Sequence, residues 1–130
     1  MNKEFVSYEQ SLALKELGFD EPCFTHYLNK ILLNNLIIKD TINSRFDNIR
    51  CSAPLKQQAF RWFRNKHNLY SEILLDRTTH PKYCFDIHQY KDFGNYEKIK
   101  NPEWFLYRTY EEAEVECIKK LIEIVKNKTQ

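Results

Sequence analysis

The sequence has 130 residues, of which 42% are hydrophobic and 15% aromatic, and its formal net charge is +2 at pH 7. This composition is that of a globular chain, which excludes a disordered or a collagen-like protein, and the length suits one domain. The small net charge does not by itself require a polyanionic partner. We therefore expect a single domain over residues 1–130.

The first predicted element is a capped helix over residues 7–17. Ser7 and Gln10 have the spacing of a capping box, in which each side chain satisfies a free backbone N–H at the helix start. Gly18 supplies the left-handed turn that ends the helix, and Phe19 can then fold back onto its last turn, as in a Schellman motif.

Strands are expected where β-forming residues gather or where apolar and polar residues alternate. Residues 82–90 alternate most clearly and are expected to pair with residues 71–77 across the turn between them. Residues 41–50 and 91–102 have no clear period and are predicted to be loops. The predicted strands cover residues 22–27, 35–40, 71–77, 82–90 and 103–109.

Two further helices are predicted. The second follows Ser52 as its N-cap, with Pro54 in the first turn, where a missing N–H costs nothing. The third runs from Thr109 to about Lys126, opened by a capping box with Glu112. Its apolar stripe consists of Ala113, Cys117, Ile118, Leu121 and Val125. This order predicts an α+β fold, with about three helices packed on a mainly antiparallel sheet of four to five strands.

The stretch "SAPLKQQAFRWFRNKHNL" (52–69) mixes aromatic and cationic residues. On a helix, its apolar residues share an arc of roughly 160°, with the arginines on the opposite side. The arc consists of Trp62, Leu55, Ala59, Phe63 and Phe60. A surface that stacks bases needs ring and cation on the same side, so we expect the aromatic arc to be core.

The opposite side of this helix is the candidate ligand-binding surface. Residues 41–82 hold eight Lys or Arg against three acidic residues, and guanidinium groups suit phosphate and carboxylate ligands. The alternative is an ordinary solvated helix face. The candidate ligand-binding residues are Arg45, Arg50, Lys56, Gln57, Arg61 and Arg64.

Catalytic and metal-binding patterns are weak. With only two glycines, the chain has no glycine-rich phosphate loop, and no third group is positioned to orient a Cys/His pair. His80, Cys84 and His88 are spaced by four, but on a strand such neighbours lie about 13 Å apart, too far to share one zinc ion. We expect no enzyme, no catalytic residue, no metal and no cofactor.

The four cysteines are widely spread, and the start "MNKEFVSYEQ" lacks the pattern of a secretory signal. Free thiols in a reducing cytoplasm are therefore expected. The longest apolar run, "ILLNNLII", is far shorter than the roughly 20 residues needed to cross a bilayer. We expect a soluble intracellular protein with no membrane partner.

Three segments together carry a resemblance: "VSYEQSLALKELGFDEPCF", "APLKQQAFRWFRNKHNL" and "TYEEAEVECIKKLIEIVKNK". They resemble a family of small uncharacterised proteins encoded by tailed phages and prophages of gut Bacteroidetes, over about half of the chain. The resemblance transfers no catalytic residue. It implies an accessory protein in the host cytoplasm that acts by binding.

The leading hypothesis is a non-enzymatic phage accessory protein that binds a host component. Such a host-defence antagonist would sequester a nucleotide signal or block a host protein. One alternative is sequence-independent nucleic-acid binding through residues 45–66, with affinity that falls steeply with salt. Another is a small structural component of the virion. Homo-oligomerisation is left open.

Overall fold

The computed structural model describes residues 2–33, 42–48, 50–76, 82–99 and 106–128. The chain divides into two compact units, residues 1–59 (unit 1) and residues 60–130 (unit 2), and each is described by itself. That the two act as one domain stays a prediction.

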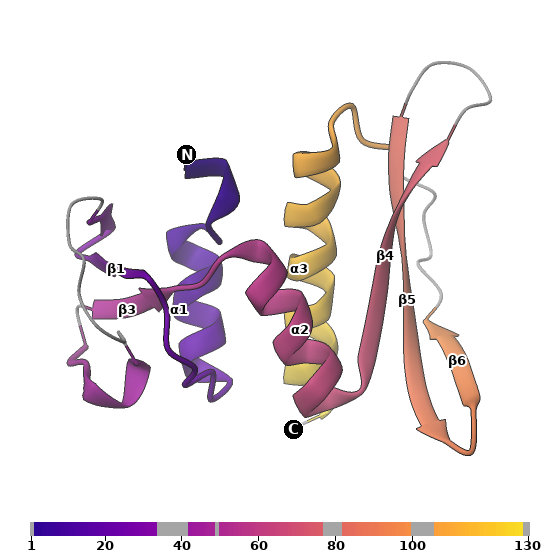
Figure 1. The fold of residues 1–130 in the computed structure, drawn as a ribbon, viewed down its shortest axis with the longest axis horizontal. Helices are drawn as coiled ribbons and strands as arrows, with labels where there is room; N and C mark the ends of the chain where they lie inside the picture. Colours follow the sequence, from indigo (N-terminus) through magenta and orange to yellow (C-terminus); the bar gives the residue numbers. More distant parts are fainter. Residues whose placement is uncertain (1, 34–41, 49, 77–81, 100–105, 129–130) are drawn as a thin grey trace. The chain divides into compact units, whose positions relative to one another are not determined.

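Unit 1 is a small antiparallel sheet with one helix. The strands follow the order β2-β1-β3, and helix α1 packs against β3 (Figure 1). Unit 1 also contains two short 3₁₀ turns, η1 (Asn2–Glu4) and η2 (Asn43–Arg45). The helix and strands are α1 (Tyr8–Glu16), β1 (Thr25–Leu28), β2 (Ile31–Leu32) and β3 (Arg50–Ala53).

Helix α1 begins and ends as predicted. The Gln10 N–H donates to the Ser7 hydroxyl at 3.3 Å, so Ser7 is the N-cap. At the other end Gly18 has a φ of 97°, and the Phe19 N–H donates to the Leu14 carbonyl at 2.9 Å. This is the hydrogen bond of a Schellman motif, and it requires a left-handed residue that glycine adopts without strain.

The start of the second helix differs from the prediction. Ser52 lies inside β3, fully buried, and its N–H donates to the Asn43 side-chain oxygen at 2.8 Å. Ser52 is therefore not an N-cap, and helix α2 (Lys56–His67) begins four residues later. The predicted loop over 41–50 was wrong at its end, where Arg50 opens β3. The predicted strand over 35–40 lies outside the described residues.

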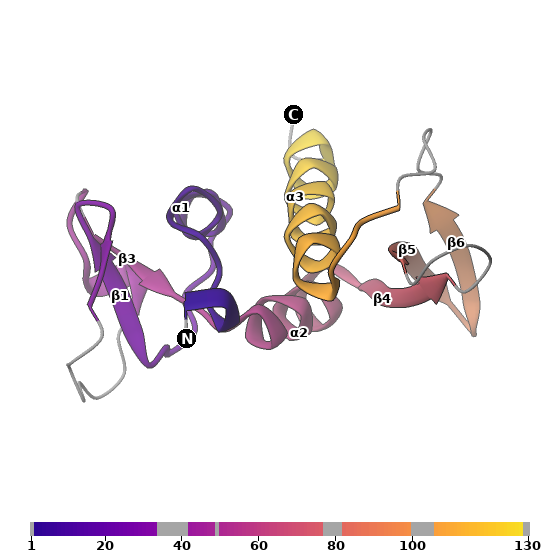
Figure 2. The ribbon, with the colours of Figure 1, turned by 90° about the horizontal axis from the view of Figure 1, so that it is seen from above.

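The sheet of unit 2 is a three-stranded antiparallel meander, in the order β4-β5-β6. Helix α3 packs against β5 and β4, so one face of the sheet is covered by this helix (Figures 1 and 2). The elements are β4 (Leu69–Asp76), β5 (Lys82–Asp92), β6 (Asn95–Ile99) and α3 (Tyr110–Lys128).

The fold class is α+β, as predicted. The described residues hold three α-helices and six strands in two sheets, whereas four to five strands in one sheet were expected. The predicted pairing of residues 71–77 with residues 82–90 is confirmed by the antiparallel register of β4 and β5. The predicted loop over 91–102 was wrong where β6 pairs with β5.

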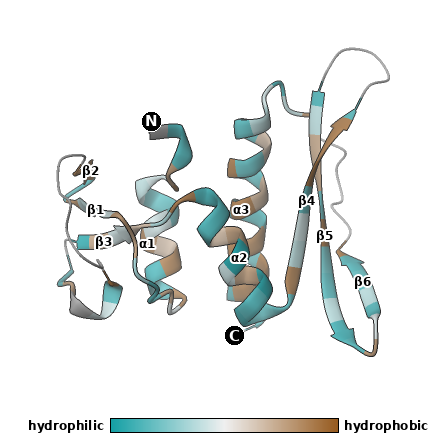
Figure 3. Cartoon of the chain, in the orientation of Figure 1, coloured by the Kyte–Doolittle hydropathy of each residue, from teal (hydrophilic) through white to brown (hydrophobic). Residues whose placement is uncertain are grey.

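Helix α3 confirms the sequence prediction closely. The Glu112 N–H donates to the Thr109 hydroxyl at 3.1 Å, while the Glu112 carboxylate accepts the N–H of Arg108 at 3.3 Å, one residue before the expected partner. All five residues of the predicted apolar stripe are buried. This helix accordingly has hydrophobic residues on one side and hydrophilic residues on the other (Figure 3). Among the described residues, no helix has the length and apolarity that a bilayer crossing requires.

Candidate functional site

The sheet of unit 2 has two chemically different faces. In β4 and β5 the odd-numbered residues face α3: Ile87 is buried there, and Ser71 hydrogen-bonds the Cys117 thiol of α3. Because successive strand residues alternate between faces, the even-numbered residues point away from α3. The register keeps this parity in β6, where Tyr96 pairs with Tyr90. We call the even-numbered face of the sheet the outer face; no helix in the described part of unit 2 covers it (Figure 2).

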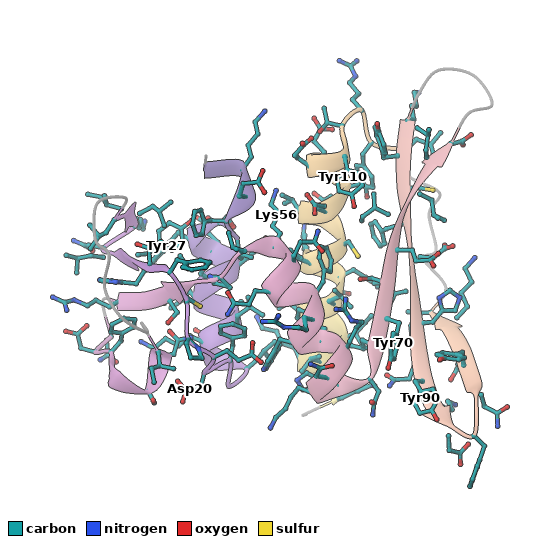
Figure 4. All side chains as sticks on the ribbon, in the orientation of Figure 1. Asp20, Tyr27, Lys56, Tyr70, Tyr90 and Tyr110 are labelled. Carbon is teal, nitrogen blue, oxygen red and sulfur yellow. The ribbon has the colours of Figure 1, made fainter. Side chains whose placement is uncertain are left out.

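Three tyrosines from three strands gather on the outer face. Ring centroids lie 6.5 Å apart for Tyr70 and Tyr90, 5.2 Å for Tyr90 and Tyr96, and 5.9 Å for Tyr70 and Tyr96. All three pairs are edge-to-face, which is a favourable aromatic geometry. Tyr96 remains 55% exposed and Tyr70 38%. Figure 4 shows Tyr70 and Tyr90 at the same end of the sheet. We call these three residues the tyrosine cluster.

The charges on the outer face nearly cancel. Three carboxylates, from Glu72, Asp76 and Asp86, share this face with two lysines, Lys82 and Lys98. Lys98 and Asp86 form an ion pair at 3.4 Å. With a formal charge of −1, this face does not attract a polyanion, although it carries the aromatic rings that nucleic-acid surfaces use.

An exposed phenylalanine lies at the turn next to the tyrosine cluster. Phe93 and Gly94 connect β5 to β6, and their φ angles of 46° and 80° are positive, as in a type I′ turn. Asn or Asp usually occupies the first of these positions, because a non-glycine residue at positive φ is strained. Phe93 is nevertheless present there, with 94% of its surface exposed.

The sequence-predicted ligand residues divide between the two units. Arg50 is exposed at the start of β3, and Gln57 is exposed on α2. Lys56 is only 5% exposed, which leaves its side chain little access to a dissolved ligand. Arg45 lies in η2, and its side chain is outside the described part of the structure.

Arg61 and Arg64 belong to unit 2. Arg61 is exposed and Arg64 half-buried, and neither makes an ion pair with a described carboxylate. The aromatic arc of the same helix is core, as predicted: Phe60, Trp62 and Phe63 are all buried. The arginines therefore remain the accessible cationic groups of the second half of α2, together with Lys66.

The cysteines are poorly suited to nucleophilic chemistry. Burial raises the pKa of the Cys23 and Cys117 thiols to about 12 and that of Cys51 to about 11. The attacking species is the thiolate, so these thiols are unreactive at neutral pH. Among the described residues, no group of three or more His, Cys, Asp or Glu side chains is arranged to hold a metal ion.

The tyrosine cluster was missed at the sequence level. Its members lie on three strands, and one of those strands, β6, was predicted to be a loop. A correct β5–β6 register would have placed Tyr90 opposite Tyr96, so the Asp92–Asn95 turn is the signal that could have revealed the cluster. Comparison of the chain with protein-family models, with curated proteins and with solved structures finds no match.

Proposed function

We propose that this chain is a non-enzymatic binding protein that blocks a partner protein through the outer face of the unit 2 sheet. The observation that carries the proposal is the tyrosine cluster, exposed on a sheet face that no described helix of unit 2 covers. In the context that the phage resemblance implies, the partner is a protein of the host, and the chain is a host-defence antagonist.

The chemistry of the outer face favours a polypeptide partner. Tyrosine offers a large apolar ring and a hydroxyl that stays hydrogen-bonded at a partly wet interface, which is why it is enriched at protein interfaces. Few residues supply most of the binding free energy in such interfaces, and aromatic residues are prominent among them. Phe93 extends the same surface with an apolar ring that has no packing role in its own sheet.

The test compares two tyrosine substitutions of equal chemistry. The chain is purified gently from a phage-exposed host extract, and native mass spectrometry identifies a stoichiometric polypeptide. Affinity for that polypeptide is then measured for Tyr96→Glu and, as the control, for Tyr110→Glu, which alters a similarly exposed tyrosine at the start of α3.

We expect Tyr96→Glu to lower the affinity at least about tenfold, the effect of losing an interface anchor, and Tyr110→Glu to leave it nearly unchanged. Equal affinities for the two folded variants would contradict the outer face as the binding surface. If the chain instead carries a small nucleotide and no polypeptide, the second candidate below is correct.

The second candidate is sequestration of a nucleotide signal by Arg61 and Arg64. It is favoured by two guanidinium groups that lie on one face of α2 without a described carboxylate partner. Guanidinium can bind a phosphate through two parallel hydrogen bonds, which lysine cannot do.

Titration calorimetry with mono-, di- and cyclic nucleotides tests this candidate. The double variant Arg61→Glu with Arg64→Glu should abolish binding, and the double lysine variant should weaken it. Lys30→Glu with Lys119→Glu changes the net charge equally at exposed sites elsewhere and should bind normally. Single-stranded DNA binding that falls steeply with salt would instead support the nucleic-acid alternative. The virion role stays a prediction, to be tested by the presence of the chain in purified particles.

A further inference from the structure

The two edges of the unit 2 sheet are protected very differently. The β6 edge is short, exposed and polar, with Lys98 in the strand and a register shift between Tyr90 and Asp92 that interrupts the ladder. Short strands, lysines and bulges are the devices by which natural sheets prevent edge-to-edge pairing. The β6 edge is therefore an unfavourable place for another strand.

The β4 edge carries none of these devices. Its eight residues, "LYSEILLD", include no Lys, Arg, Pro or Gly, and they pair with β5 without a shift. The hydrophobic stretch Ile73–Leu75 stands out on this strand (Figure 3). Within the described part of the chain, no strand pairs with β4 on its other side. A long and regular free edge with the apolar stretch Ile73–Leu75 is a template for a further strand.

The backbone groups that face this free edge can be identified from the register. The Tyr90 N–H donates to the Asn68 carbonyl at 2.9 Å, and Asn68 directly precedes β4. Antiparallel strands exchange hydrogen bonds at every second residue, so the even-numbered residues of β4 bond β5. The odd-numbered residues Ser71, Ile73 and Leu75 therefore direct their N–H and C=O groups toward the free edge.

We propose that β4 pairs with β4 of a second copy of this chain, antiparallel across a two-fold axis at Ile73, so that the two sheets form one continuous six-stranded sheet. Ile73 then exchanges both backbone hydrogen bonds with Ile73 of the second copy, and Ser71 pairs with Leu75. The paired residues are odd-numbered, so the pairing uses the backbone N–H and C=O groups that β5 leaves free. Odd-numbered residues pair with odd-numbered ones, so the outer faces of the two sheets lie on the same side of the continuous sheet.

Charge selects this register over its neighbours. In the proposed register, Glu72 lies opposite Leu74 and Tyr70 lies opposite Asp76, so no like charges face each other. An axis at Glu72 would place that carboxylate opposite its own copy, and an axis at Leu74 would place Glu72 opposite Asp76. Like charges directly opposite each other on neighbouring strands are destabilising.

The pairing also covers apolar surface that unit 2 leaves exposed. Leu75 is 44% exposed although its side chain lies on the same face as α3. In the proposed dimer it packs beside Ser71 and Ile73 of the second copy, which extends the apolar layer across the axis. A second copy is the partner that supplies an edge of matching length and complementary register, because it is the same strand.

The experiment measures the self-association of the purified full chain by sedimentation velocity over a range of concentrations. Leu74→Lys and Leu74→Glu remove the same side chain but place opposite charges against Glu72 of the second copy, twice in each dimer. We expect a concentration-dependent dimer in the unchanged chain, at least about tenfold weaker association for Leu74→Glu, and undiminished or tighter association for Leu74→Lys.

Leu75→Pro provides an independent test, because it removes an N–H that faces the free edge and leaves the bonds to β5 in place. This variant should be monomeric with its thermal unfolding still cooperative. A chain that is monomeric at every concentration overturns the proposal, as does equal weakening by both Leu74 variants. The measurement uses no other partner, so its outcome is independent of the proposed function.

Discussion

The rings of Tyr70 and Tyr96 meet edge to face at 5.9 Å although the whole of strand β5 lies between their own strands. The ring of Tyr90, on β5, contacts the rings of both Tyr70 and Tyr96. The outer face of the sheet is thus organised by aromatic contacts that cross strands, and these contacts have a measurable energy.

A double-mutant cycle should detect this coupling. Replacing Tyr70 and Tyr96 by leucine, singly and together, should give a coupling free energy of unfolding of about 0.5–1.5 kcal/mol, the value of an aromatic pair beyond its buried area. Chemical denaturation measures it. Strictly additive effects would mean that the rings touch without stabilising each other.

Phe93→Asn should stabilise unit 2 while weakening partner binding. Asparagine tolerates the positive φ of a type I′ turn better than phenylalanine, so the free energy of unfolding should rise by about 0.5–1 kcal/mol. The exposed ring would be lost at the same time, and affinity for the partner protein should fall. Phe93→Leu is the matched control, since it keeps an apolar side chain and the strain. A stabilised variant with undiminished affinity would remove Phe93 from the binding surface.

Truncating a side chain should lower stability strongly on the buried side of α2 and hardly at all on its exposed side. Phe63→Ala should cost about 3–5 kcal/mol, because Phe63 is fully buried and its removal leaves a cavity. Arg61→Ala, on the exposed side two residues away, should change stability by less than about 0.5 kcal/mol. Urea denaturation followed by tryptophan fluorescence suits the comparison. A large cost for Arg61→Ala would place that residue in the core.

Unit 2 should lose stability on mild acidification. Burial, together with Lys128 and Lys66, holds the pKa of His67 below its ordinary value of 6.5. The unfolded chain therefore binds a proton on His67 at a higher pH than the folded chain, so stability increases with pH between the two pKa values. The contribution of neutral His67 is complete above about pH 6.5 and is lost as the pH falls toward the folded pKa.

Both tryptophans lie within residues 60–130, so their fluorescence reports on unit 2. The free energy of unfolding should fall from pH 7.5 to pH 5.5, and His67→Gln should reduce the slope over this range, since glutamine does not titrate. An identical slope in the variant would assign the acid sensitivity to other groups.

One thiol should react before the others. Cys23, Cys51 and Cys117 are buried, whereas Cys84 is half-buried on the outer face. A disulfide-exchange reagent should therefore label one cysteine in the native protein and four after denaturation, and Cys84→Ser should abolish the native reaction. Rapid labelling of more than one thiol in the folded chain would contradict the burial of the other three.

The sequence predicts best the elements whose signals are local. The Ser7 and Thr109 caps, the Gly18 turn and the stripe of α3 all depend on residues within a few positions of each other, and each was found where expected. The long strands β4 and β5 were found for the same reason, through hydrophobic content and alternation.

Three short strands, β2, β3 and β6, were missed because no alternating pattern marks them and only pairing with another strand creates them. In β3, "RCSA" has no alternating pattern, and the strand is held by its register with β1 and by the Asn43 side chain. In β6, "NYEKI" is polar and largely exposed, and only pairing with β5 makes it a strand. The tyrosine cluster depends on that pairing, which is why the candidate surface was sought on α2 instead. The position of Lys56 was also mispredicted. Its charge indicated a surface position, but the side chain is buried in the folded chain.

Helix α2 has residues in both compact units, because the boundary at residues 59 and 60 falls within its twelve residues. Separating the units at that point would leave each with a fragment of about two turns or less, shorter than a helix that is stable alone in water. We therefore expect that neither unit 1 nor unit 2, cut between residues 59 and 60, folds as an independent domain in a gene fusion. In evolutionary terms, insertions and crossovers should be tolerated at the β1–β2 turn and selected against in the middle of α2.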